Sequence, residues 1–249
     1  MKKLTLFVTF LLFSSMLFSQ IGEITPTAKR FETTRALKNV YVSHDNEDDS
    51  YTLCIGSDNQ FEEKNAFLKL GHGAQEALTS LSNLYKAIQT PEITFEVGNY
   101  SLSTFAVSTK HYGMVHTTGA LEFAAGSYVF DEEALGNAMI IIIDKFPDFD
   151  YSSIVVTTKR IYGDAKSSIG ITGVLCDFYH PQLNVHFVGG VDKVNVGSDK
   201  NATKLMALLP VAGEEWKQND YKVVVMGIDN KVLKILKPFF EKVFRAKAQ

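Results

Sequence analysis

The chain has 249 residues, of which 45% are hydrophobic and 21% charged, and a formal net charge of −3 at pH 7. This length suits one large domain or two small ones, each able to bury a hydrophobic core. A slightly acidic chain offers no general attraction to nucleic acid, so small molecules or other proteins are the expected partners.

The first 19 residues have the pattern of a cleavable secretory signal peptide: a positive start at Lys2 and Lys3, an apolar run over residues 4–13, and a small residue at Ser19. A retained anchor is the weaker alternative, because a membrane-spanning helix needs about 20 apolar residues. No cysteine follows the apolar run, so a lipoprotein is not expected. We expect a periplasmic or secreted protein, and losing the two lysines changes its charge from −3 to −5.

Strands are expected first in the mature chain. Apolar runs at residues 40–43 and 51–55 flank the acidic segment 44–50, which indicates two strands joined by a solvated loop. A third strand is expected at 67–70.

The clearest helix is predicted at residues 74–88, where apolar residues recur at steps of three and four before Pro91. The pattern then changes to period two over residues 93–97, and Gly98-Asn99 is suited to a tight hairpin turn. Further strands are expected at residues 101–109, 112–117 and 121–130.

Asp131 is predicted to cap a second helix, with Glu132 and Glu133 in its first turn. Ile140 and Ile141 make this segment apolar on its far side too. We therefore expect it to be covered on two sides, or to be partly a strand.

Residues 146–150 are the candidate internal boundary, which divides the mature chain into units at 20–146 and 151–249 unless it forms one continuous domain. A short helix at 202–209 and a final helix that Pro238 should kink or divide are expected in the second unit. The expected strands of this unit are 153–158, 169–179, 183–188, 193–196 and 221–226. Strands in succession with interspersed helices predict an α+β fold, with predominantly antiparallel sheets packed by amphipathic helices.

Three aspartates follow strand-like runs in a Gly-x-Asp pattern, at Asp58, Asp199 and Asp229. Turn chemistry alone accounts for this pattern. The alternative is a ligand or cation site shared by these loops, and we add His72, beside the start of the first helix, as a weak fourth candidate.

Reaction motifs are missing from the sequence. Gly71-His72-Gly73 precedes a helix, but Glu76 takes the place of the third glycine of a dinucleotide fingerprint, so a strand-to-helix turn is expected instead. Phosphate-loop and nucleophile-elbow motifs are absent. We predict no cofactor.

No metal site is predicted. The six histidines form no zinc motif. Residues 45–49 are acidic, but Ser50 and Gly56 stand where a calcium loop needs glycine and glutamate.

Cys54 and Cys176 lie in apolar runs, where free cysteine behaves as a small buried hydrophobe, and a disulfide between them is the alternative. The final helix has a basic face beside its apolar stripe. Contact with a membrane surface is possible there, although cations near a helix C-terminus also complement its dipole.

The expected function is that of an exported, non-enzymatic domain that binds a small molecule or a protein. A periplasmic or secreted hydrolase is the second hypothesis, because catalytic carboxylates from separate loops need no sequence motif. Two or three convergent titratable groups would favour catalysis.

Overall fold

The computed structural model describes residues 31–37, 39–56, 65–111, 114–123, 129–162, 173–192, 194–196, 221–223 and 230–247. The predicted signal peptide, the predicted helix at 202–209 and the candidate residues Asp58, Asp199 and Asp229 lie outside these ranges. The fold is α+β with antiparallel sheets, as predicted. None of the helices within these ranges is long and apolar enough to cross a membrane.

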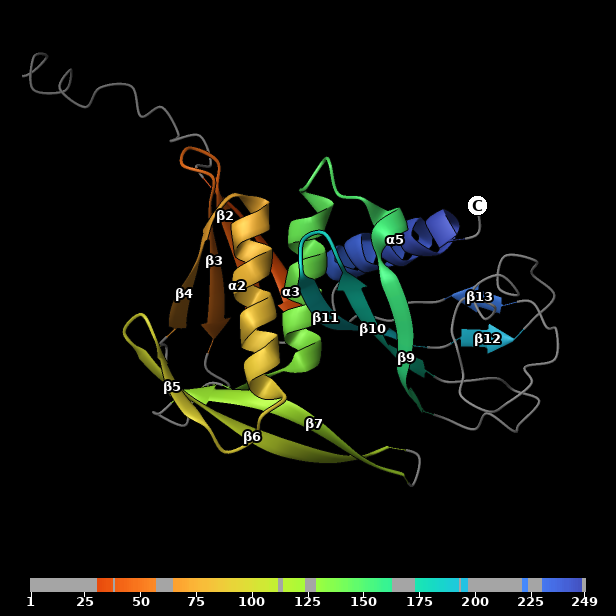
Figure 1. The fold of residues 1–249 in the computed structure, drawn as a ribbon, viewed down its shortest axis with the longest axis horizontal. Helices are drawn as coiled ribbons and strands as arrows, with labels where there is room; N and C mark the ends of the chain where they lie inside the picture. Colours follow the sequence, from red (N-terminus) through yellow and green to blue (C-terminus); the bar gives the residue numbers. More distant parts are fainter. Residues whose placement is uncertain are drawn as a thin grey trace, which may run out of the picture. The chain divides into compact units, whose positions relative to one another are not determined.

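Sheet A is a four-stranded antiparallel sheet in chain order. Its strands are β1 (Phe31–Leu37), β2 (Val40–Asp45), β3 (Ser50–Gly56) and β4 (Asn65–His72). Side chains alternate between a buried and a more exposed face along β3 and β4; Leu53 and Leu68, which face each other across the two strands, are both buried. Helices pack on the buried face (Figure 1).

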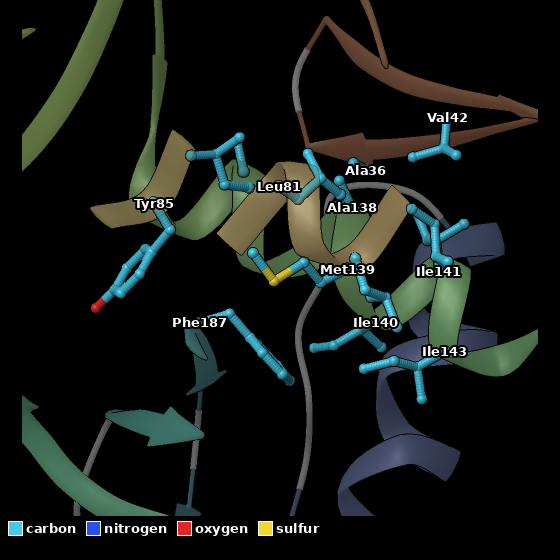
Figure 2. Packing of buried hydrophobic residues seen from close by; sticks show 14 of the residues in the cluster. Ala36, Val42, Leu81, Tyr85, Ala138, Met139, Ile140, Ile141, Ile143 and Phe187 are labelled. Atoms are coloured by element: carbon cyan, nitrogen blue, oxygen red, sulfur yellow. The ribbon is translucent and has the colours of Figure 1, made fainter. Parts of the chain in front are cut away.

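Helices α2 (Gly73–Ile88) and α3 (Glu132–Asp144) lie side by side between sheet A and strands β9–β11 (Figure 1). The predicted cap of α3 is confirmed, because the Asp131 carboxylate accepts a hydrogen bond from the Ala134 N–H at 2.8 Å. Residues 134–143 of α3 are all buried, since α2, α5, β1 and β11 surround this helix. The apolar residues on both of its sides are explained by this central position (Figure 2).

Sheet B follows α2 and is also four-stranded and antiparallel. Its strands are β5 (Thr94–Val97), β6 (Tyr100–His111), β7 (Met114–Phe123) and β8 (Val129–Asp131). The predicted hairpin turn at Gly98-Asn99 is confirmed, and Gly98 has the positive φ of +59° that such turns require. The prediction of separate strands at 112–117 and 121–130 is wrong, because β7 runs without a break from 114 to 123, where it pairs with the long strand β6.

Sheet C has the order β11-β10-β9, so β10 is its central strand. Its strands are β9 (Val155–Tyr162), β10 (Gly173–His180) and β11 (Val185–Asp192), and the short 3-10 helix η1 (Tyr151–Ser153) precedes them. Two further short strands, β12 (Val194–Val196) and β13 (Tyr221–Val223), pair with each other.

The C-terminal helix α5 (Asn230–Lys247) packs its apolar stripe into the core. Phe239 and Phe240 are buried and contact the ring of Phe178 on β10, at 5.4 and 5.6 Å between centroids. Of the predicted kink or division at Pro238, the division does not occur, because the helix continues through this residue.

One cluster of buried side chains runs from Ala36 to Val243. It includes Phe149, which lies within the segment predicted as an internal boundary. The described residues from Phe31 onward belong to one compact unit.

Candidate functional site

His72 ends β4 and is exposed at the N-terminus of α2. Its backbone N–H donates to Glu76 Oε2 at 2.8 Å, and its ring Nδ1 lies 3.0 Å from the backbone oxygen of Asp48. Gly71 and Gly73 both have positive φ angles, as a sharp strand-to-helix turn requires. His72 is therefore engaged with the adjoining hairpin, and the three aspartates proposed to join it lie in the part of the chain left undescribed.

The acidic loop between β2 and β3 uses its carboxylates for local hydrogen bonds. Asp45 accepts from the Glu47 N–H and Asp48 accepts from the Ser50 N–H, both at 3.0 Å, and Asp49 lies 2.7 Å from His44 Nε2. Such bonds stabilise a tight turn. Nowhere in the described ranges do three potential metal-binding side chains group together.

Cys54 and Cys176 are both free, so the alternative of a disulfide between them is wrong. Cys54 is half-buried on the outer face of β3, whereas Cys176 is fully buried on β10. Burial, with a smaller contribution from the neighbouring Asp177 carboxylate, raises the pKa of the Cys176 thiol to about 12. Such a thiol is unreactive at neutral pH.

Five polar side chains from five separate elements converge beside sheet C. We call this group the Tyr85 network, and it joins α2, α3 and the three strands of the sheet. Its members are Tyr85, Glu132, Lys159, Asp177 and His186.

The inner end of the network is the ion pair between Glu132 and Lys159. Lys159 Nζ lies 2.5 Å from Glu132 Oε2, and the side chains are 28% and 2% exposed respectively. Gln89, at the end of α2, donates a longer bond of 3.4 Å to the same oxygen. The other carboxylate oxygen, Glu132 Oε1, is buried and has no hydrogen-bond partner within the described structure.

A β-bulge places Lys159 in this position. Along β10, Cys176 pairs with Thr158, but its neighbour Leu175 pairs with Arg160. Lys159 is thus left without a cross-strand partner in this ladder. Bulges redirect side chains near functional sites, and here the redirected side chain reaches the start of α3.

Tyr85 connects the inner and outer ends of the network. Its hydroxyl donates to Asp177 Oδ1 at 3.2 Å and accepts from Lys159 Nζ at 3.4 Å. Figure 2 shows the Tyr85 hydroxyl directed away from the labelled aliphatic side chains of the core. Burial and the neighbouring carboxylates of Asp177 and Glu132 raise the pKa of Tyr85 far above its usual value, so this phenol stays a hydrogen-bond donor.

The outer end is the Asp177–His186 pair, with His186 Nε2 3.6 Å from Asp177 Oδ1. Partial burial acts to raise the pKa of Asp177, but His186, Lys159 and Tyr85 together outweigh it and hold the pKa below its usual value. The side chains of Asp177 and His186 remain 28% and 36% exposed. The contacts from Tyr85 and His186 are both to Asp177 Oδ1, and no described residue donates to Oδ2.

An apolar surface adjoins this pair. Tyr179 pairs directly with Val155 on one side and with His186 on the other, and Asp177 is two residues along the same strand, so all four share one face. We call these four residues the sheet C face. Tyr179 is 38% and Val155 46% exposed, and the described residues contain one other large hydrophobic residue exposed in this way, Phe67 on sheet A.

Sequence reasoning missed the Tyr85 network because its members belong to no local motif. The sequence did predict Asp177 and His186 in two strands that follow each other along the chain, at 169–179 and 183–188, and Tyr85 on the apolar face of a helix. The alternation of side chains along the strands could have indicated that Asp177 and Tyr179 share a face, but the register of β10 on β11 was needed to place His186 beside them.

Chemically, the network supplies fixed donors and acceptors at the edge of an exposed aromatic surface.

In comparisons with known proteins, the chain matches no family model, no curated protein and no solved structure.

Proposed function

We propose that this protein is an exported, non-enzymatic domain that binds a small molecule on the sheet C face. The observation that carries the proposal is the contact between an exposed aromatic side chain, Tyr179, and a carboxylate–imidazole pair, Asp177 and His186, already held in place by Tyr85. Convergent polar groups beside apolar surface are the usual composition of a binding site.

Pre-organisation supports binding at this place. Asp177 and His186 lie on adjacent strands of one sheet, and Tyr85 holds Asp177 from the neighbouring helix. Because these groups are already ordered, binding a ligand to them costs less conformational entropy than binding to groups on flexible loops.

The size of the apolar surface favours a small molecule over a protein partner. A stable protein interface buries about 800 Å² on each partner and involves about 20–30 residues a side, with few charges at its centre. On the sheet C face the exposed large hydrophobic residues are Val155 and Tyr179, and charged side chains stand directly beside them.

Export is supported by the first 19 residues, which have the three regions of a signal peptide. Expression of the full-length chain in a bacterial host with cell fractionation tests this part. Processing near Ser19 and recovery outside the cytoplasm are expected, and an unprocessed cytoplasmic chain would contradict export.

The binding proposal is tested by a thermal-shift screen of the chain purified after export, against sugars, amines, peptides and metal ions. A ligand that binds the native state raises the melting temperature. The shift is expected to disappear in Tyr179→Ala and to persist in Phe67→Ala, which removes a comparably exposed ring from sheet A. A shift that persists in Tyr179→Ala would place the ligand elsewhere and overturn the proposed site.

A hydrolase is the second candidate, because the structure brings two carboxylates from separate elements to one group. Glu132 and Asp177 both contact the unit formed by Lys159 and Tyr85. Turnover of glycoside or ester substrates that is lost in both Glu132→Gln and Asp177→Asn would favour this candidate. Ligand binding without turnover would favour the binding domain.

A further inference from the structure

We infer that the ligand of the sheet C face is a neutral saccharide, with one ring face against Tyr179 and a hydroxyl group donating to Asp177. This inference rests on the proposed function and names its ligand class. It follows from the shape of the aromatic surface, the carboxylate acceptor beside it and the charges of the network behind it.

The aromatic surface has the form of a corner. The rings of Tyr179 and His186 are nearly perpendicular, at 81°, with centroids 6.0 Å apart, and the Tyr85 ring also contacts His186, at 5.1 Å between centroids. A sugar ring has an apolar face of C–H groups and an edge of hydroxyl groups. The corner matches both, because Tyr179 and Val155 offer apolar surface while His186 offers a ring nitrogen.

Asp177 supplies an acceptor that is fixed and charged. Its Oδ1 is held by Tyr85 at 3.2 Å, while Oδ2 receives no bond from the described residues. Hydrogen bonds to an ionised acceptor are shorter and roughly twice as strong as neutral ones. A ligand hydroxyl is a donor that can bond to such an oxygen without bringing in a second charge.

The charges of the network favour a neutral ligand. The Lys159 ammonium lies in the same group as Asp177 and already offsets part of its negative charge, so an added amine meets a like charge. Two carboxylates, Glu132 and Asp177, disfavour an anion. A hydroxyl-rich neutral molecule avoids both repulsions.

The test is an NMR titration of the exported chain with three neutral oligosaccharides, namely maltotriose, cellobiose and N,N′-diacetylchitobiose. Tetramethylammonium chloride and an uncharged hexapeptide are the comparison ligands. At least one saccharide is expected to shift the ring resonances of Tyr179 and His186. Saturation of the Tyr179 ring protons is expected to transfer to the C–H protons of the bound sugar.

Two variants sharpen the result. Tyr179→Ala should abolish binding, and Asp177→Asn should weaken it about tenfold or more, since a hydrogen bond to a charged group is replaced by a neutral one. Phe67→Ala is the matched control and should bind as the wild type does. Because Asp177→Asn also alters the network, the unchanged spectrum of the sheet A residues serves as its folding check.

The outcomes separate this inference from the proposed function. Shifts of Tyr179 with tetramethylammonium or the peptide but with no saccharide would overturn the assignment of a saccharide and leave binding at the sheet C face standing. No shift of Tyr179 or His186 with any of the five ligands would count against both.

Discussion

Gly136 of α3 lies directly against the backbone of Val188 in β11: a Cβ atom built on Gly136 would lie 1.6 Å from the Val188 carbonyl oxygen and 2.7 Å from its carbon. The absence of a side chain at this one position lets the central helix approach the edge of sheet C. This close approach helps to bring the start of α3, with Glu132, to the Tyr85 network.

Gly136→Ala is therefore expected to lower the free energy of unfolding by about 1–3 kcal/mol, as overpacking does. The direction of this change distinguishes a packed from an exposed position, because replacing glycine by alanine in an exposed helix raises the free energy of unfolding by about 1 kcal/mol. Urea unfolding of the wild type and the variant measures the difference in the free energy of unfolding. Gly56→Ala, whose added Cβ meets its nearest atom at 3.3 Å, is the control and should cost less. A stabilised Gly136→Ala protein would contradict the contact.

Glu132→Gln is expected to lower the free energy of unfolding by about 3 kcal/mol, the low end for breaking a buried pair, because Lys159 keeps 28% of its side chain exposed. The double variant Glu132→Gln/Lys159→Met should recover part of this loss. The exposed pair of Lys145 and Glu32, at 2.7 Å, is the control, and Lys145→Met should cost less than about 1 kcal/mol. An equal decrease in the free energy of unfolding for Glu132→Gln and Lys145→Met would contradict the burial of Glu132.

Tyr85→Phe removes the hydroxyl that donates to Asp177 Oδ1. The pKa of Asp177 is expected to rise, since this hydrogen bond is one of the contacts that lower it, and about 1 kcal/mol of stability is lost with the bond. Carboxyl-carbon NMR over a pH series measures the pKa. Tyr179→Phe, which keeps the ring beside His186, should leave it unchanged, and the same result for Tyr85→Phe would exclude the Tyr85–Asp177 bond.

Asp150 is expected to stabilise the fold in a defined acid range. Hydrogen bonds from Ser152 and Ser153 at the start of η1 lower the pKa of its carboxyl from 3.8 to about 2. A depressed folded-state pKa means that the contribution is complete above 3.8 and is lost as the pH falls toward 2.

The melting temperatures of the wild type and Asp150→Ala should accordingly differ above pH 3.8 and converge as the pH falls toward 2. Asp148→Ala, which removes another exposed carboxylate close by, is the control for the loss of a surface charge. A difference that stays constant across this range would mean that the Asp150 charge plays no part.

The cysteines are expected to titrate as two free thiols in the unfolded chain and to differ in the native state. Cys54 is half-buried, whereas Cys176 is fully buried with its pKa raised to about 12. A thiol reagent at pH 8 should thus modify Cys54 slowly and spare Cys176 until the protein unfolds. Mass mapping of the labelled peptides identifies the site, and early modification of Cys176 would contradict its burial.

Much of the fold was predictable because it depends on neighbouring residues. The apolar spacing of α2, the Asp131 cap of α3 and the Gly98-Asn99 hairpin are set by backbone preferences and by which face meets water. The same local signals failed at β7, where pairing with the long strand β6 extends one strand through residues that alternate poorly. At Pro238 the helix is not divided, and the adjacent Phe239 and Phe240 pack on Phe178 within one continuous helix.

The sequence by itself determined the α+β class, the main helices and the expectation of export. Only the tertiary structure decided that Cys54 and Cys176 stay apart and that Tyr85 meets Asp177 across 92 residues of chain. The physical reason is the sequence separation of the residues that interact. Secondary structure follows from interactions within a few residues, whereas the candidate site depends on strand register, on the bulge at Lys159 and on the approach of α3 to β11, which form only when distant segments pack together.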